Sequence, residues 1–329
     1  MTGIPTYSIA IRTLGTGGEA FLQEIASIRR QTLSPEKVVA YLAEGYTFPD
    51  GALRLFPDMQ VVTVSKGMVA QRALPYDEIG SECILMLDDD VELAPDSAER
   101  LIKALTEHGA DCVGADVFQN HRMPLKTKLF AALTNLVFPH WSNRWAFKVQ
   151  KNGSFSYQAH PRKAFYWSQS CGGPAWLWRK DAFAGLRMAD ECWLDRLGFA
   201  YGDDLLEAYK LYRNNGRLGI LYDAGITHLD AQSSSGSFRK SRAYIYVRTK
   251  AQLMIWYRSL FRNGKDTAVS RCRAGVAYLL KVLWMIPVIM GAALLQRDRH
   301  YIGSYFKGLC DGWKEVHAPS FRQLPPYIL

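Results

Sequence analysis

The sequence predicts an α/β fold, in which a mostly parallel central sheet carries helices on both faces. Segments typical of strands and of helices alternate from Tyr7 to Phe118, in units of about 20–30 residues. The run Cys83–Leu87 is apolar throughout, as in a strand that is covered on both sides. Hydrophobic residues make up 48% of the chain and charged residues 22%, which provides for a full core and excludes a wholly disordered protein.

Four further segments are predicted as strands of this sheet. Each is short and apolar, and β-branched side chains are frequent among them. In chain order they are Tyr7–Arg12, Val38–Leu42, Gln60–Val64 and Cys112–Phe118.

Three segments between the strands are predicted as helices: Glu19–Gln31, Met68–Leu74 and Pro95–Glu107. In the first, apolar side chains from Phe21 to Ile28 recur at helical spacing. Pro75 ends the second, and a proline suits the first turn of the third.

Charge divides the chain into two parts. The whole chain has 40 Lys and Arg against 31 Asp and Glu, but residues 231–329 alone carry 16 basic and four acidic residues. The change coincides with the flexible-looking run Ser233–Ser237. We therefore predict a catalytic domain over residues 1–235 and a basic, apolar, helical region over residues 236–329. Such a region favours a polyanionic partner, whether anionic lipid, nucleic acid or a phosphorylated substrate.

The basic region also contains a long apolar run. Val282–Leu295 is fourteen residues without a charge, flanked by Lys281, Arg297 and Arg299. A membrane-spanning helix needs about 20 apolar residues, so we predict a helix that lies in a membrane interface; the alternative is a buried helix of a second small bundle. Basic residues mixed with apolar runs suit an anionic membrane surface better than nucleic acid.

The cysteines and the N-terminus bear on location. None of the six cysteines forms a CxxC pair, and in a chain of this size they are best interpreted as reduced thiols. The first ten residues lack the pattern of a secretory signal. We expect a cytoplasmic protein, peripheral on the inner face of the cell membrane.

Three consecutive carboxylates, Asp88, Asp89 and Asp90, directly follow the buried strand. The carboxyl end of a central parallel strand is where open α/β sheets bind ligands. A divalent cation such as Mg²⁺ or Mn²⁺ would neutralise the cluster. The alternative is a polar turn in which an aspartate caps the next helix.

A second acidic pair, Asp203 and Asp204, precedes an amphipathic helix that begins at Leu205. A carboxylate here could act as a general base, and the helix N-terminus is expected to lower its pKa. The alternative is that the pair only caps the helix.

Two further segments are candidates for binding. Gly172-Gly173-Pro174 would let the backbone approach a ligand, and Trp176 could face a sugar ring, unless the segment is a plain turn into a core strand. Arg239 and Arg242 follow the Ser/Gly run, where they could close over a diphosphate or form a solvated face near a membrane.

The order of these motifs resembles a family-2 glycosyltransferase of the GT-A fold, the fold of nucleotide-diphospho-sugar transferases, over roughly residues 7–250. The resemblance rests on the Ser8–Arg12 strand, Asp88–Asp90, Gly172–Pro174 and Gly202–Leu205. The match is incomplete. Arg12-Thr-Leu-Gly stands where the family's first strand usually ends in Pro-x-Tyr-Asn, and Glu44 follows the second strand where the family has an aspartate that contacts the nucleotide base.

The resemblance implies an inverting enzyme that moves a sugar from a nucleotide-diphosphate donor to a saccharide or lipid-linked saccharide, in cell-surface polysaccharide or glycolipid assembly. It implies Asp204 as the catalytic base, and Asp90 and His228 as contacts of an Mn²⁺ or Mg²⁺ ion. The residues assigned to the nucleotide-sugar are Arg12, Glu44, Asp88, Asp89, Gly173, Trp176, Asp203, Arg239 and Arg242. The alternatives are a sugar nucleotidyltransferase and a non-enzymatic basic protein that binds membranes or nucleic acid.

Overall fold

A computed structural model describes residues 3–117, 125–138, 144–199, 201–229 and 241–329. The strands are β1 (Tyr7–Thr13), β2 (Val38–Ala43), β3 (Gln60–Val64), β4 (Cys83–Asp88), β5 (Val91–Leu93), β6 (Cys112–Ala115), β7 (Phe147–Val149), β8 (Phe155–Tyr157), β9 (Phe165–Ser168), β10 (Ala175–Arg179), β11 (Leu218–Leu221) and β12 (Ile226–His228). The α-helices are α1 (Gly18–Arg29), α2 (Asp50–Leu55), α3 (Met68–Arg72), α4 (Ser97–Glu107), α5 (Leu125–Thr134), α6 (Lys180–Ala184), α7 (Asp203–Arg213), α9 (Arg242–Trp256), α10 (Ala268–Leu295), α11 (His300–His317) and α12 (Pro319–Arg322). A 3₁₀ segment, η1 (Met188–Leu197), and a π-helical turn, η2 (Tyr257–Phe261), complete them.

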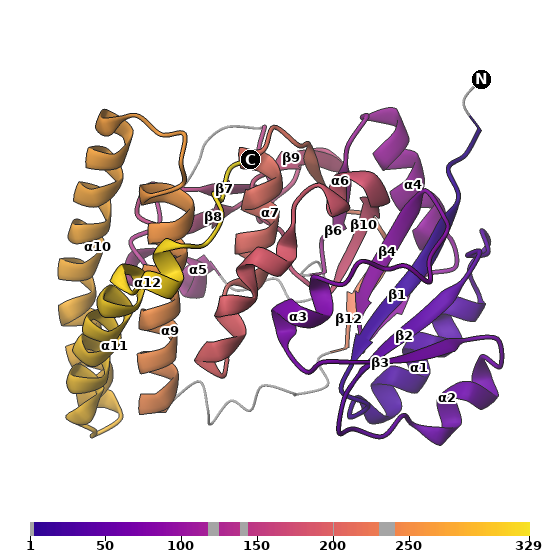
Figure 1. Ribbon diagram of the computed structural model, residues 1–329, viewed down its shortest axis with the longest axis horizontal. Helices are drawn as coiled ribbons and strands as arrows, with labels where there is room; N and C mark the ends of the chain where they lie inside the picture. The colour runs from indigo at the N-terminus through magenta and orange to yellow at the C-terminus, as the bar shows by residue number, and fades with distance from the viewer. Residues whose placement is uncertain (1–2, 118–124, 139–143, 200, 230–240) are drawn as a thin grey trace.

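The central sheet has eight strands in the order β3-β2-β1-β4-β10-β6-β11-β9 (Figure 1). β3, β2, β1 and β4 run parallel to one another, and so do β6 and β11. β10 runs antiparallel between β4 and β6, and β9 is an antiparallel edge strand. The predicted α/β fold with a mostly parallel sheet is confirmed.

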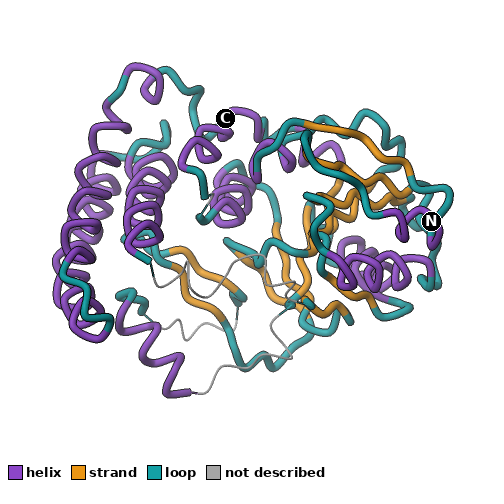
Figure 2. The backbone as a smooth tube through the Cα atoms, turned by 90° about the horizontal axis from the view of Figure 1, so that it is seen from below, coloured by secondary structure: helices purple, strands orange, loops and turns teal. Residues whose placement is uncertain are grey.

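Alternation along the strands gives the sheet two apolar faces. Ile9, Ile11 and Leu85 belong to one buried cluster, into which α1 and α4 pack. Ala10 and Met86 belong to the other, which α3, α7, α9 and α10 cover. Helices therefore lie on both sides of the sheet, and the C-terminal helices stand together beyond one side of it (Figures 1 and 2).

The structure contains the predicted strands and helices, with small differences at their ends. β3 matches its prediction, and α4 begins at Ser97, two residues after Pro95. β6 ends at Ala115, which is earlier than predicted, and Phe118 lies outside the described residues.

The C-terminal region is helical, as expected, and shares a core with the rest of the chain. Tyr278 and Val316 join the same buried cluster as Trp176. The hydroxyl of Tyr327 donates to the backbone oxygen of Leu206 in α7 at 2.6 Å. The predicted boundary near residue 235 falls among residues that are not described.

The apolar run Val282–Leu295 is the second half of α10, a helix of 28 residues. By length and composition alone, α10 is the one helix in the described part of the chain that could cross a membrane.

Candidate active site

The pairing of β1 with β4 brings Arg12 beside the first of the three aspartates. The two strands are parallel, with Arg12 opposite Asp88. The guanidinium of Arg12 lies 2.6 Å from a carboxylate oxygen of Asp88 and donates to the backbone oxygen of Gly173 at 3.2 Å. Arg12, Asp88 and Gly173 thus meet at one end of the sheet, as predicted for the carboxyl ends of parallel strands.

Asp89 lies against the end of β1. It accepts a hydrogen bond from the hydroxyl of Thr13 at 2.5 Å. Burial raises the pKa of Asp89 to about 6, with smaller contributions from Asp88 and Asp90, although the Thr13 bond opposes the rise. Next to the cluster, Glu24 of α1 is fully buried, and burial raises its pKa well above its usual value.

Asp90 leads into a small two-stranded antiparallel sheet made by β5 and β12. Antiparallel pairing places His228 opposite Val91, the neighbour of Asp90. The Nε2 atom of His228 is 3.1 Å from a carboxylate oxygen of Asp90, and Asp90 is only 6% exposed. The two residues assigned to the metal are therefore adjacent in space, although 138 positions separate them in the sequence.

Asp90 and His228 fit a cation that takes only part of its ligands from the protein. The described residues contain no group of three or more His, Cys, Asp or Glu side chains arranged to hold a metal ion. Mg²⁺ in phosphate-transferring sites is commonly bound by one or two carboxylates, with substrate phosphates and waters completing its shell. The donor set of Asp90 and His228 agrees with that pattern and excludes a cage built from these residues alone.

The second acidic group begins helix α7. Gly202, with φ +82, takes the left-handed conformation that turns the chain into the helix. Asp203 and Glu207 are four residues apart on one face of the helix, and both are buried. Burial raises the pKa of Glu207 to about 7 even though Arg72 lowers it.

Arg72 joins the two acidic groups. Its guanidinium lies 3.2 Å from Asp203, 3.8 Å from Glu207 and 3.9 Å from Asp88. Burial alone would lower the pKa of Arg72, but the carboxylates, Asp203 foremost, raise it. Because one side chain contacts both groups, the aspartates after β4 and the N-terminus of α7 border the same site.

Neighbouring residues hold Arg72 in place. It lies over the ring of Trp176 at 5.6 Å, and a Cβ atom on Gly173 would come within 2.5 Å of its guanidinium. Asp195 accepts hydrogen bonds from the backbone amides of Val69 and Ala70, at 3.0 and 2.8 Å, at the start of α3. A side chain at Gly173 would therefore displace the guanidinium of Arg72, and Asp195 orients the helix that carries Arg72.

The remaining predicted residues lie in different places. Glu44 follows β2 and is exposed at the same edge of the sheet. Trp176 is only 2% exposed, so it lies beneath the site and offers no open ring to a sugar, as the core-strand alternative holds. Arg242 begins α9 and pairs with Asp298 of the C-terminal region at 3.1 Å, a contact that does not involve the acidic groups of the site. Arg239 lies outside the described residues.

The expected low pKa of Asp204 is wrong. Burial and, to a smaller extent, the neighbouring Asp203 raise the pKa of Asp204 to about 7, although Arg72 and a hydrogen bond from the amide of Leu205 oppose the rise. The helix N-terminus favours the charged form, but loss of water around the carboxylate outweighs it. Asp204 thus titrates near neutral pH, where a general base is most effective.

Sequence reasoning missed Arg72, Glu207 and Glu24. The spacing of Asp203 and Glu207 was a usable signal, since residues four apart share a helix face. Arg72 gave no signal, because only the packing of α3 against the sheet and α7 brings it to the carboxylates.

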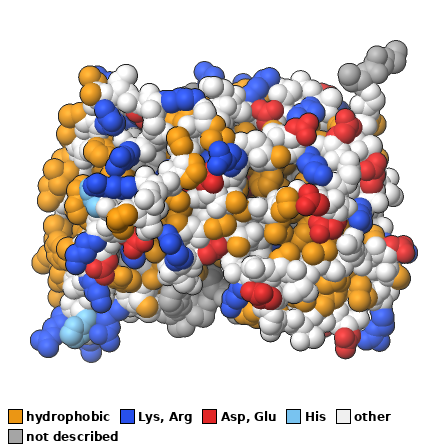
Figure 3. Space-filling model, in the orientation of Figure 1, with side chains coloured by type: hydrophobic (Ala, Val, Ile, Leu, Met, Phe, Trp, Pro, Cys, Tyr) orange, Lys and Arg blue, Asp and Glu red, His pale blue; other side chains and the backbone are white. Residues whose placement is uncertain are grey.

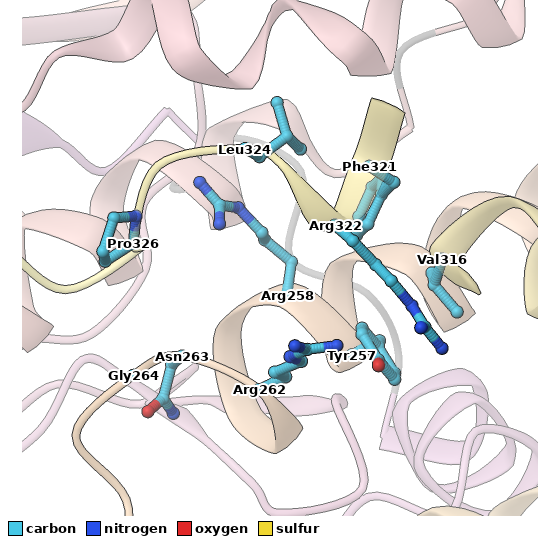
Figure 4. A pocket seen from close by; sticks show the side chains of 10 residues that line it. All are labelled: Tyr257, Arg258, Arg262, Asn263, Gly264, Val316, Phe321, Arg322, Leu324 and Pro326. Atoms are coloured by element: carbon cyan, nitrogen blue, oxygen red, sulfur yellow. The ribbon is translucent and has the colours of Figure 1, made fainter. Parts of the chain in front are cut away.

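A cavity of about 190 Å³ lies elsewhere, in the C-terminal region (Figure 4). Its lining includes Arg258, Arg262 and Arg322, and none of its ten residues belongs to the acidic groups. Arg258 also contacts the buried Glu191 at 2.8 Å, an interaction within the core. The cavity is separate from the candidate active site.

Comparisons with known proteins bear on the fold. No protein-family model matches the chain, and no curated protein matches it either. The chain shares its fold with solved glycosyltransferase structures.

Two solved structures illustrate the likeness. One is the mannosyltransferase PcManGT from Pyrobaculum calidifontis in complex with GDP-Man and Mn²⁺, with a TM-score of 0.50 and 16% identity over 98% of this chain and 83% of that one. The other is TarS 1–349 from S. aureus, with a TM-score of 0.55 and 11% identity over 94% and 81% of the two chains. At these identities the likeness establishes the fold.

Proposed function

We propose that the protein is an inverting glycosyltransferase, similar to family 2, which transfers a sugar from a nucleotide-diphosphate donor to an acceptor hydroxyl. The observation that carries the proposal is Arg72, which contacts Asp88 and Asp203 at once. A donor-binding aspartate group and a candidate base therefore border one site. The glycosyltransferase fold supports the same assignment.

The rim near β1 and β4 is suited to the donor. Arg12 fixes the carboxylate of Asp88, which is still 34% exposed and can accept hydrogen bonds from a ribose. Asp90 and His228 would hold Mn²⁺ or Mg²⁺, which when bound stabilises the negative charge of the departing diphosphate. The related mannosyltransferase structure contains GDP-Man and Mn²⁺, which supports a divalent cation and a nucleotide-sugar here.

Asp204 is suited to the acceptor. In the proposed reaction its carboxylate takes the proton from the acceptor hydroxyl while the hydroxyl oxygen bonds to the anomeric carbon. The bond between that carbon and the diphosphate oxygen breaks, and the nucleoside diphosphate leaves with its electron pair. A single displacement inverts the anomeric configuration and needs no carboxylate nucleophile.

We further propose a saccharide or lipid-linked saccharide acceptor, a role in cell-surface polysaccharide or glycolipid assembly, and a cytoplasmic location. The unpaired state of all six cysteines suits a reducing compartment. A screen of UDP-, GDP-, CMP- and dTDP-sugars by thermal shift and by product analysis tests the donor class. Nucleotide-sugar turnover supports the proposal, and stabilisation by none of these donors contradicts it.

Replacing Asp90 by Ala should remove the metal-dependent part of donor binding. In the wild type we expect Mn²⁺ and a nucleotide-sugar together to raise the melting temperature more than the nucleotide-sugar alone. Asp90→Ala should lose that increment, and Asp58→Ala, an exposed aspartate, should keep it. An unchanged Mn²⁺ increment in Asp90→Ala would show that the cation binds elsewhere.

Transfer should depend on pH through Asp204. Because its pKa is raised to about 7, the carboxylate is mostly protonated at pH 6 and mostly ionised at pH 8. Only the ionised form accepts a proton, so kcat/KM should rise with pH and level off above about pH 8. A pH–rate profile at constant ionic strength measures this; a rate that is flat from pH 5.5 to 8, or falls, contradicts the assignment.

A further inference from the structure

We propose that α10, joined by α5, forms a membrane-docking face that lies flat on a bilayer containing anionic lipid. This inference goes beyond the proposed function and does not depend on the reaction. We call the exposed apolar side chains of α10 and α5 the docking face. They are Val269, Val276, Leu279, Leu280, Leu283, Trp284, Met290, Leu294 and Leu295 on α10, with Leu129, Phe130 and Leu133 on α5.

The exposed side of α10 is apolar along almost its whole length. Val276, Leu280, Leu283 and Leu294 recur at spacings that place them on one helix face, and each is more than half exposed to solvent. Soluble monomers rarely leave such a continuous apolar stripe uncovered. A helix that is apolar all round belongs in a core or in lipid, and this one is packed on one side only.

The opposite side of α10 is fixed to the protein. Ala274, Tyr278 and Ala293 are buried, and the ring of Tyr278 stacks on Trp256 of α9 at 4.2 Å. The hydroxyl of Tyr305 in α11 donates to the backbone oxygen of Val282 at 2.9 Å. Crossing a membrane would break these contacts, whereas lying in its surface keeps them.

Helix α5 extends the same surface. Leu129, Phe130 and Leu133 are each between 60% and 66% exposed. The indole of Trp284 donates to the backbone oxygen of Leu133 at 2.7 Å, which joins the end of α5 to the middle of α10. Tryptophan with one polar contact and an exposed ring is typical of membrane interfaces.

Charge favours anionic lipid as the occupant. Arg271 and Arg273 lie near the start of α10 and are exposed, and Arg297 and Arg299 follow its end. Figure 3 shows hydrophobic side chains along the left edge, which carries α10, with Lys and Arg beside them and at the lower corner. Basic residues at both ends of an apolar helix suit the negative headgroups of an anionic surface.

Vesicle sedimentation tests the proposal with the full chain. The wild type should sediment with vesicles of phosphatidylcholine and phosphatidylglycerol, and less with phosphatidylcholine alone or at high salt. The variant Leu280→Glu/Leu283→Glu/Leu294→Glu should lose about tenfold or more in binding. The matched control is Leu53→Glu/Leu55→Glu on α2, whose side chains are 42% and 40% exposed, and it should bind like the wild type.

A second variant keeps the test decisive if the glutamates disturb folding. Replacing Arg271, Arg273, Arg297 and Arg299 by Gln leaves the apolar face intact and should weaken binding and its dependence on salt. Sedimentation velocity without lipid should give a monomer. The proposal is overturned if the wild type stays in the supernatant, or if the leucine and arginine variants both bind normally. It is also overturned if the wild type forms a dimer that the leucine variant dissociates, because a second copy would then cover the face.

Discussion

Asp204→Asn should abolish sugar transfer while leaving donor binding intact. A general base contributes about 10²–10⁴-fold to a rate, and an amide cannot take up the acceptor proton at neutral pH. Asparagine matches aspartate in size and can still accept the hydrogen bond from the amide of Leu205, which Asp204 accepts at 2.7 Å. Turnover of labelled nucleotide-sugar measures the loss, and thermal shift with Mn²⁺ measures the retained binding.

The control for this variant is Asp223→Asn, an exposed aspartate in the turn after β11. It should transfer sugar at the wild-type rate. Normal turnover by Asp204→Asn would show that another group takes the proton, and loss of donor binding together with turnover would place Asp204 at the donor instead.

Arg72→Met should have the largest effect on stability. Methionine keeps apolar contact with Trp176 but leaves Asp203 and Glu207 buried without their cation. Removing one partner of a buried ion pair costs about 3–5 kcal/mol. Denaturant unfolding at pH 8 measures the free energy of unfolding.

The destabilisation should depend on pH in a defined direction. Burial already raises the pKa values of Asp203 and Glu207, and without Arg72, which lowers them, these values rise further. In the wild type Glu207 ionises near pH 7, whereas in the variant it should keep its proton to higher pH, and holding a proton that the unfolded chain has released costs stability. The loss should therefore grow as pH rises through about 7 and shrink below it. Arg100→Met, at an exposed pair with Asp96, should change stability by less than about 1 kcal/mol. An Arg72→Met protein as stable as the wild type at pH 8 would contradict the central position of this arginine.

The half of the sheet made by β3, β2, β1 and β4 was predictable from local pattern. Short apolar strands alternate with amphipathic helices there, and the carboxyl-end rule placed Asp88 at the rim of the sheet where ligands bind. The pairing of Arg12 with Asp88 follows from the order of the strands alone, because β1 and β4 are neighbours in the sheet.

The direction of β10 was not predictable. An apolar pattern shows that Ala175–Arg179 is buried, but a strand that runs either way buries the same side chains. Its antiparallel position between β4 and β6 brings Gly173 to Arg12 and Trp176 beneath Arg72.

Contacts that depend on tertiary packing were also beyond local pattern. Arg72 was part of a predicted helix without a role, and two of its partners, Asp203 and Glu207, lie more than a hundred residues away in α7. The pKa of Asp204 was expected in the wrong direction, because the sequence shows the helix N-terminus but not the burial around it. The length of α10 was underestimated for a similar reason: Lys281 interrupts the apolar run, yet it is buried inside the helix bundle.

A crystal structure of Asp204→Asn with a nucleotide-sugar and Mn²⁺ tests the central claim most directly, since the variant should hold the donor without consuming it. We predict an anomalous manganese signal beside Asp90 and His228, with the diphosphate on the cation and the anomeric carbon facing residue 204. A donor bound away from these carboxylates, for instance in the arginine-lined C-terminal cavity, would contradict it.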